Sequence, residues 1–243
     1  MGDFTDRPGV ALVVGGSGGL GRAIAELLRE RGSAVAVTHR SNPVGDSHQL
    51  DLGAPTVAAD AARVVEDVAA RGGLHTLVYA AGPHVPMTHL SAVEPGAMAA
   101  QLAADAAGFF AVVAPALPHL REIQGSIVAV TTAATTRFPV RDGLSSAPKA
   151  AVEAMVRALA AEEGRYGVRV NAVGPGMLTD GMAARLIDSG ELSEDALAIT
   201  RRNIPLRRFG TAQDIAEAVC FLASDRAGFV SGQKLDVDGG YGV

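Results

Sequence analysis

The stretch that decides the fold lies near the N-terminus and reads VALVV (Val10–Val14), then GGSGGLG (Gly15–Gly21), then RAIAELL (Arg22–Leu28). An apolar run typical of a strand is followed by a glycine loop and an amphipathic helix. This order presents backbone N–H groups and a helix N-terminus to a pyrophosphate. The glycines fit two spacings, GxGxxG through Gly16, Gly18 and Gly21, or GxxxGxG through Gly15, Gly19 and Gly21. Because a strand precedes the loop and a helix follows it, we interpret it as a phosphate-binding loop rather than a simple turn.

Apolar strand-like runs and helical patterns alternate along the rest of the chain. The predicted strands are 10–14, 34–39, 74–79, 126–131, 168–173 and 234–237, and the predicted helices lie near 20–31, 56–70, 97–114, 147–163 and 212–223. Such alternation predicts a parallel sheet with helices on both faces. Only twelve residues separate Val37 from Leu50, so we expect this connection to pass as a loop that leaves the adenosine end of the site open.

The composition is typical of a protein that binds a small molecule. With 243 residues and 48% hydrophobic residues, it suits one α/β domain over 1–243. The 21 basic and 26 acidic residues form no stripe for nucleic acid or an anionic membrane. The single cysteine, Cys220, suits a core position in a reducing cytoplasm, and Met1–Asp6 lacks the features of a signal peptide. The longest apolar stretch, Ala106–Leu120, contains two prolines and is expected to be too short to span a bilayer.

Three further motifs carry a family resemblance. LVYAAG (Leu77–Gly82), VRVNAVGPG (Val168–Gly176) and VDGG (Val237–Gly240) follow the glycine loop in this order. Together they resemble the short-chain dehydrogenase/reductase family over nearly the whole chain. The resemblance implies a seven-stranded, doubly wound, Rossmann-like sheet in three αβα layers, and a nicotinamide dinucleotide as cofactor.

The end of the second strand indicates which nicotinamide cofactor is used. An NAD site carries a carboxylate there for the ribose 2′-OH, whereas this chain has His39, Arg40 and Ser41. Arg40 and Ser41 suit a 2′-phosphate, so we predict NADP(H), and by resemblance Asp51 meets the adenine. The predicted cofactor residues are Gly15, Ser17, Gly19, Leu20, Gly21, His39, Arg40, Ser41, Asp51, Leu52, Ala81, Gly82, Lys149, Pro175 and Gly176, and no metal site is predicted.

The catalytic positions depart from the family, which uses Asn, Ser, Tyr and Lys. By position these become Asp105, Thr132, Ser145 and Lys149, so only the lysine is retained. Thr132 keeps a hydroxyl that can orient a carbonyl. Asp105 introduces an anion that would favour the charged form of Lys149. Ser145 is a far weaker acid than a phenol and its side chain is several ångströms shorter. It is at least as well interpreted as a residue that caps the start of the following helix.

Another group must then supply a proton, and our candidate is His84 in the loop after the 74–79 strand. The alternative is that His84 is only a solvated surface residue. Tyr79 is expected to be strand core. Arg137, Arg141 and Asp142 lie between Thr132 and Ser145, where they would line the substrate cleft or be exposed at the surface.

Three functions fit these residues. The first is an NADP(H)-dependent oxidoreductase acting on a carbonyl, the second a nucleotide-binding protein without turnover, and the third a dehydratase or isomerase on the same scaffold. The mixed segment 177–205 predicts an amphipathic lid and a mainly apolar substrate. The Ala-rich helices near 97–114 and 147–163 predict a homo-oligomer, either a dimer or a tetramer.

Overall fold

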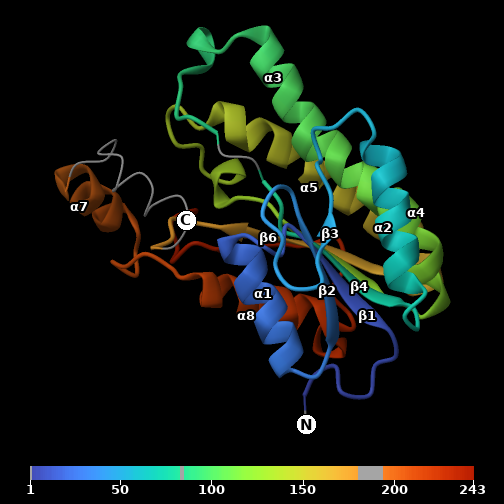
Figure 1. Ribbon diagram of the computed structural model, residues 1–243. Helices are drawn as coiled ribbons and strands as arrows, with labels where there is room; N and C mark the ends of the chain where they lie inside the picture. The colour runs from blue at the N-terminus through green and yellow to red at the C-terminus, as the bar shows by residue number, and fades with distance from the viewer. Residues whose placement is uncertain (1, 83–84, 180–193) are drawn as a thin grey trace.

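A seven-stranded parallel sheet forms the centre of the molecule (Figure 1). The computed structural model describes residues 2–82, 85–179 and 194–243. The strands are β1 (Val10–Val14), β2 (Ala34–His39), β3 (His48–Gln49), β4 (Leu74–Tyr79), β5 (Ser126–Val130), β6 (Arg169–Pro175) and β7 (Lys234–Val237). Their order is β3-β2-β1-β4-β5-β6-β7, so the direction of winding reverses at β1. This confirms the predicted doubly wound, Rossmann-like α/β fold.

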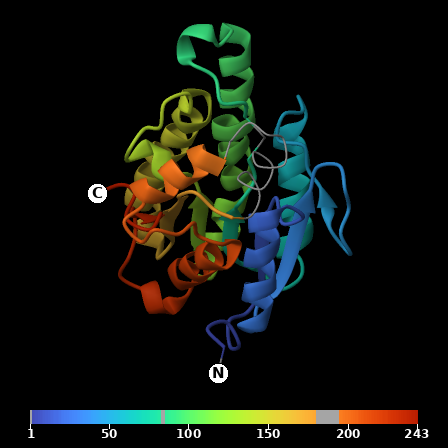
Figure 2. The same ribbon diagram turned by 90° about the vertical axis from the view of Figure 1, so that its left-hand side faces the viewer.

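Helices cover both faces of the sheet, giving three layers (Figures 1 and 2). On one face α1 (Gly19–Glu30) packs against α8 (Ala212–Ala223). The other face carries α2 (Val57–Ala69), α4 (Gly108–Glu122) and α5 (Gly143–Glu163). In Figure 1, α3 (Pro95–Leu102) rises beyond the sheet and α7 (Glu194–Asn203) lies to one side. Short helical turns are η1 (Leu90–Ala92), η2 (Ala103–Ala107), η3 (Ala133–Thr135), η4 (Gly164–Tyr166) and η5 (Asp225–Ala227).

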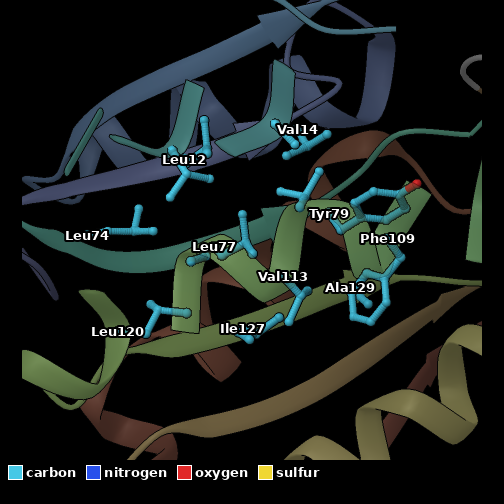
Figure 3. Packing of buried hydrophobic residues seen from close by; sticks show 14 of the residues in the cluster. Leu12, Val14, Leu74, Leu77, Tyr79, Phe109, Val113, Leu120, Ile127 and Ala129 are labelled. Atoms are coloured by element: carbon cyan, nitrogen blue, oxygen red, sulfur yellow. The ribbon is translucent and has the colours of Figure 1, made fainter. Parts of the chain in front are cut away.

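Side chains along each strand point alternately to the two faces of the sheet, so the core has two parts, one on each face. Leu12, Leu77 and Ile127 face α2, α4 and α5, whereas their neighbours Val13, Val78 and Val128 face α1 and α8. All six are fully buried, as a parallel sheet covered on both faces requires. In the first layer the ring of Tyr79 meets Phe109 edge to face, with 5.3 Å between centroids (Figure 3). The core thus fixes the carboxyl ends of β1, β4 and β5, where ligands bind in such sheets.

Several predicted boundaries need correction. The fifth strand stops at Val130, and β6 runs from Arg169 to Pro175. The connection after β2 is a loop, as predicted, but it contains the missed strand β3, whose His48 pairs with Thr38. A two-residue strand is too short to show an alternating pattern. The last helix before β6 begins at Gly143 rather than at 147, so Ser145 and Lys149 both lie inside it.

The predicted helix 97–114 is part of a longer one. Helix continues from Pro95 to Glu122 through a π turn at Ala103–Ala107, despite Pro115 and Pro118 within α4. By length and composition this 28-residue segment could cross a membrane, which corrects the expectation that the stretch is too short. Phe109, Val112, Val113, Ala116 and Leu120 are nevertheless buried in the core of this fold. Half of the helix therefore belongs to the αβα sandwich.

Candidate functional site

The glycine loop is folded tightly against the carboxyl ends of β1 and β2. Gly15 has a φ of +81°, and its N–H donates to Thr38 Oγ1 at 2.9 Å. A Cβ at Gly21 would lie 2.3 Å from the carbonyl oxygen of Gly15, so only glycine lets α1 approach this closely. The structure therefore gives a steric reason for Gly15 and Gly21, two of the three glycines of the GxxxGxG spacing.

The start of α1 is free to take an anion. Its N-cap, Gly18, makes no side-chain capping bond, and the first turn has no acidic residue. A Cβ built on Gly19 meets nothing within 4 Å, so the space in front of the loop is open. The first N–H groups of a helix have no partner within the helix. Gly19, Leu20 and Gly21 thus form a cradle that fits the pyrophosphate of a dinucleotide, and Ser17 sits partly exposed beside it.

The predicted adenosine end lies at β2 and β3. Arg40 and Ser41 are exposed directly after β2, whereas His39 is buried with its Nδ1 2.8 Å from Ser47 Oγ. The Oδ1 atom of Asp51 accepts from the Gly53 N–H at 3.0 Å and the residue remains exposed. A cavity of about 550 Å³ opens between α1 and the 40–47 loop, lined in part by Gly16, Ser17, Val37 and Val44. The loop crossover leaves this end open, as the sequence suggested.

Lys149 is held in a buried ion pair. Its Nζ lies 2.7 Å from Asp105 Oδ1 and donates to the Ala81 carbonyl at 3.3 Å. Both charged residues are at most 9% exposed. Gly82 lies close by, since a Cβ there would be 3.4 Å from Nζ. The structure therefore brings together Lys149, Asp105, Ala81 and Gly82, which sequence reasoning had assigned to one site.

The π turn that carries Asp105 is braced by Tyr79. The extra residue of such a turn leaves carbonyl groups without regular helical partners, and the Tyr79 hydroxyl donates toward Ala104 O at 3.3 Å and Asp105 O at 3.2 Å. Burial, reinforced by the Asp105 carboxylate, raises the pKa of the Tyr79 phenol well above its usual value. Tyr79 is thus a structural donor that stays protonated, and it is too enclosed to meet a substrate.

Thr132 and Ser145 keep partly exposed hydroxyls on neighbouring segments. Thr132 Oγ1 accepts from the Ala134 N–H at 3.1 Å, which leaves its O–H as a donor. Ser145 does not cap the helix, because it is the third residue of α5 and the N-cap position is Asp142. Instead its backbone N–H donates to the Asp142 carbonyl at 3.0 Å. The capping interpretation of Ser145 is therefore wrong, because α5 begins earlier than its sequence pattern indicates.

The segment between Thr132 and Ser145 forms one wall beside the site. Arg137 donates to the Tyr241 carbonyl at 3.0 Å and stacks over that ring, so it ties down the C-terminal tail. Asp142 is half-buried, and burial raises the pKa of its carboxyl to about 6. Arg141 is exposed.

Other predicted residues lie at the far edge or outside the described part. Gly176 follows β6, and its N–H donates to Val237 O at 3.0 Å, which fixes the Pro175-Gly176 turn against β7. The Thr179 N–H donates to Gly210 O at 2.8 Å. His84 lies outside the described residues, as do residues 180–193 of the predicted lid.

Sequence reasoning missed the roles of three residues. Thr38 anchors the glycine loop, Tyr79 braces the π turn, and the Asp142 carboxyl is partly desolvated. A threonine inside an apolar strand was a usable signal for the first. The other two depend on a π turn and on packing, which a single sequence does not reveal.

Comparison with known proteins gives consistent matches. Residues 14–242 match the family model described as enoyl-(acyl carrier protein) reductase. The chain is 33% identical to acetoacetyl-CoA reductase from Synechocystis, covering 96% of this chain and 95% of that protein. It is 32% identical to a probable 2,4-dienoyl-CoA reductase from Bacillus subtilis, covering 94% of each. Among solved structures, a short-chain type dehydrogenase/reductase from Mycobacterium ulcerans superposes with a TM-score of 0.89 at 28% identity, covering 98% of this chain and 90% of that one.

Proposed function

Because the chain belongs to the short-chain dehydrogenase/reductase family, we propose that it uses NADP(H) to reduce a carbonyl group of a mainly apolar small molecule. The chain is an oxidoreductase of this family, whose members use a nicotinamide dinucleotide. Relatives named acetoacetyl-CoA reductase and probable 2,4-dienoyl-CoA reductase support a reduction of a small molecule.

The proposal rests on one observation. The segments that would hold the cofactor lie next to one another at the carboxyl ends of the strands. The glycine loop and α1 offer an open cradle for the pyrophosphate. Beyond the reversal point of the sheet, Ala81, Gly82 and Lys149 lie together where β4 ends. In doubly wound sheets a dinucleotide lies across this crevice. The arrangement therefore fits the whole cofactor rather than a phosphate alone.

NADP(H) is proposed over NAD(H) because of charge at the end of β2. Arg40 and Ser41 are exposed there and no carboxylate stands at that position. Asp51, the acid predicted to meet the adenine, has Oδ1 engaged by the Gly53 N–H. A guanidinium suits a phosphate dianion, whereas a ribose 2′-OH calls for a carboxylate.

Calorimetric titration tests the cofactor assignment. NADPH is expected to bind more tightly than NADH. Arg40→Ala should reduce the difference between the two binding free energies by about 1–3 kcal/mol, the contribution of a charge-assisted hydrogen bond. Arg165→Ala is the matched control, because Arg165 follows α5 at the opposite end of the sheet. Equal affinity of the parent protein for the two nucleotides would refute the assignment.

The residues of this chain have distinct tasks in the reaction. When bound, the reduced nicotinamide supplies a hydride. Lys149 binds the nicotinamide ribose, and its ion pair with Asp105 holds the ammonium group in place. Thr132 donates its hydroxyl hydrogen to the substrate carbonyl and so orients it. Ser145 is too short and too weakly acidic to replace a tyrosine. Positioning can lower a barrier by several kcal/mol, so the loss of tyrosine is compatible with turnover.

A second candidate is a protein that binds the nucleotide without turnover. The observation that favours it is the ion pair of Lys149 with Asp105, together with Ser145, which gives this lysine no phenol to activate at the tyrosine position. Hydride transfer is required only by the first candidate.

We also propose that residues 1–243 act as one domain with a lid near 177–205, and that the protein is a cytoplasmic homo-oligomer. Family members commonly assemble. In support, Phe110 on α4 is 53% exposed, an apolar surface that a second copy of α4 could cover. The buried thiol of Cys220 is compatible with a reducing compartment.

A further inference from the structure

A network of charged and hydroxyl side chains lies next to Thr132, the residue that would orient the substrate carbonyl. It joins three segments that are far apart in the sequence, the η3 turn, helix α5 and strand β7. Its centre is Lys234, one of two lysines in the chain, the other being Lys149. The network has no part in the cradle for the pyrophosphate, and its contacts lead to Thr132.

Lys234 connects the η3 turn to two carboxylates. Its Nζ donates to Thr135 Oγ1 and, at 3.0 Å, to Thr136 Oγ1. The same Nζ lies 3.0 Å from Asp236 Oδ1 and 3.4 Å from Glu153 Oε1. Glu153 is buried, and the side chains of Lys234 and Asp236 are 16% and 22% exposed. Because water screens such partly buried charges only weakly, the ammonium group holds both threonines firmly.

The two threonine hydroxyls complete the network. Thr135 Oγ1 lies 2.8 Å and 2.9 Å from the two carboxylate oxygens of Glu153, and Thr136 Oγ1 donates to Asp236 Oδ2. Each threonine therefore accepts from the ammonium group and donates toward a carboxylate. Glu153 is four residues after Lys149, so it lies on the same side of α5, one turn further along. The network thus ties the η3 turn to the helix that carries Lys149.

The η3 turn holds Thr132 at both of its oxygen atoms. Thr132 is the N-cap of η3, and its Oγ1 accepts from the Ala134 N–H at 3.1 Å. Its carbonyl oxygen lies 3.1 Å from Thr135 Oγ1, whose single hydrogen is shared between this carbonyl and Glu153. A displacement of the turn would therefore move the Thr132 hydroxyl, which must reach the substrate carbonyl.

Strand β6 leaves room for the network because residue 174 is glycine. A Cβ built on Gly174 would lie 2.1 Å from Asp236 Oδ1 and 2.7 Å from Lys234 Cε. It would also lie 3.1 Å from the carbonyl carbon of Thr132. A side chain at this position would thus collide with the network. The Lys234 and Asp236 side chains are therefore packed close to the main chain of Thr132.

We propose that Lys234 is a positioning residue for the reaction, because it fixes the η3 turn and so sets the direction of the Thr132 hydroxyl. This rests on the proposed reductase function, in which Thr132 donates to the substrate carbonyl. Lys234 itself touches neither substrate nor cofactor and acts through Thr132. Without the ammonium group, Glu153 and Asp236 would leave two like charges beside the turn, and their repulsion would displace the two threonines.

Transfer of deuterium from NADPH labelled at C4 to a panel of ketones tests the effect on the reaction. Lys234→Met should lower kcat by about 10–100-fold, the effect of a misplaced orienting group. NADPH affinity, measured by calorimetry, should be unchanged. Thr132→Ala should also lower kcat. Because Lys234 acts through Thr132, adding Lys234→Met to Thr132→Ala should change kcat by less than about twofold.

Amide hydrogen exchange tests the effect on the turn and needs no turnover. The Ala134 N–H donates to Thr132 Oγ1, so its exchange rate reports whether Thr132 is held. Lys234→Met should raise this rate by about fivefold, as expected for the loss of one hydrogen bond. The Gly15 N–H, which donates to Thr38 Oγ1 in the glycine loop, should exchange as in the parent.

Three variants separate positioning from a general loss of stability. Arg121→Met breaks the ion pair of Arg121 with Glu163, a buried carboxylate at the far end of α5. It should lower the free energy of unfolding without changing kcat. Thr135→Val removes the hydroxyl but keeps the branched shape, and should reproduce the loss of kcat. Thr135→Ser keeps the hydroxyl and should retain the parent rate.

Two results would overturn the assignment while the reductase function stands. One is a parent that transfers deuterium and a Lys234→Met protein with unchanged kcat. The other is a Lys234→Met loss that multiplies with the Thr132→Ala loss, since an independent structural effect would do so. If Lys234→Met does not fold, Thr135→Val takes its place in each comparison. If the parent binds NADPH but labels no member of the panel, the reductase function fails, and unchanged exchange at Ala134 in Lys234→Met would then overturn the positioning as well.

Discussion

Replacing Lys149 by methionine should destabilise the protein strongly, because it leaves the Asp105 carboxylate buried without a cation. The Nζ–Oδ1 distance is 2.7 Å, and the Lys149 and Asp105 side chains are 11% and 3% exposed. At an effective dielectric constant of 20 the attraction is about 6 kcal/mol, most of it offset by desolvation. Removing one partner of such a pair costs about 3–5 kcal/mol. The only other side-chain donor to Asp105 among the described residues is Gln101, at 3.4 Å.

The free energy of unfolding is measured by urea titration at pH 7.5, followed by circular dichroism and extrapolated linearly. Asp105→Asn combined with Lys149→Met should recover most of the loss, since the amide is neutral and can still bond. Arg22→Met is the control, because it breaks an exposed pair with Glu26 and should produce no measurable change. A Lys149→Met protein within 1 kcal/mol of the parent, or a double variant no more stable than the single one, would refute this account of the pair.

Two further predictions concern stability and assembly. Burial lowers the pKa of His75 to about 4 from its ordinary 6.5; a depressed pKa contributes stability that is present above pH 6.5 and lost as pH falls toward 4. Between pH 7.5 and 4, the free energy of unfolding of the parent, measured by urea titration, should therefore fall by about 3 kcal/mol more than that of His75→Asn. Equal decreases in the two proteins would contradict the lowered pKa of His75. The exposed Phe110 predicts a dimer or tetramer in light scattering at micromolar concentration; a monomer rejects the oligomer, and Phe110→Asp should shift the parent assembly toward smaller species.

The sequence predicts the large elements of this molecule well because they have strong local signals. Five of the seven strands are mainly apolar runs, and β7 (KLDV) alternates charged and apolar residues. Gly15 and Gly21 in the glycine loop are required by close steric contacts. The missed strand β3 is two residues long and depends on its neighbour β2. A strand of this kind has no pattern of its own.

The sequence indicated one pair of neighbours in the candidate site but not the local structure around them. The family resemblance placed Asp105 near Lys149, and the two residues form an ion pair. The early start of α5 and the π turn at Ala103–Ala107 follow from packing between distant segments. The Asp142 carboxyl is desolvated by burial, and the adjacent Gly143 lies close to Leu90, some fifty residues earlier. Because burial of this kind arises from packing between distant segments, no local pattern could reveal it.

We propose that this chain transfers hydride although its tyrosine position holds Ser145. In the most direct test, the parent protein is incubated with NADPH deuterated at C4 and a panel of apolar ketones. The products are then analysed by mass spectrometry. We expect an alcohol that carries one deuterium at the former carbonyl carbon and forms in step with oxidation of NADPH. Tight NADPH binding without deuterium in any product would contradict it.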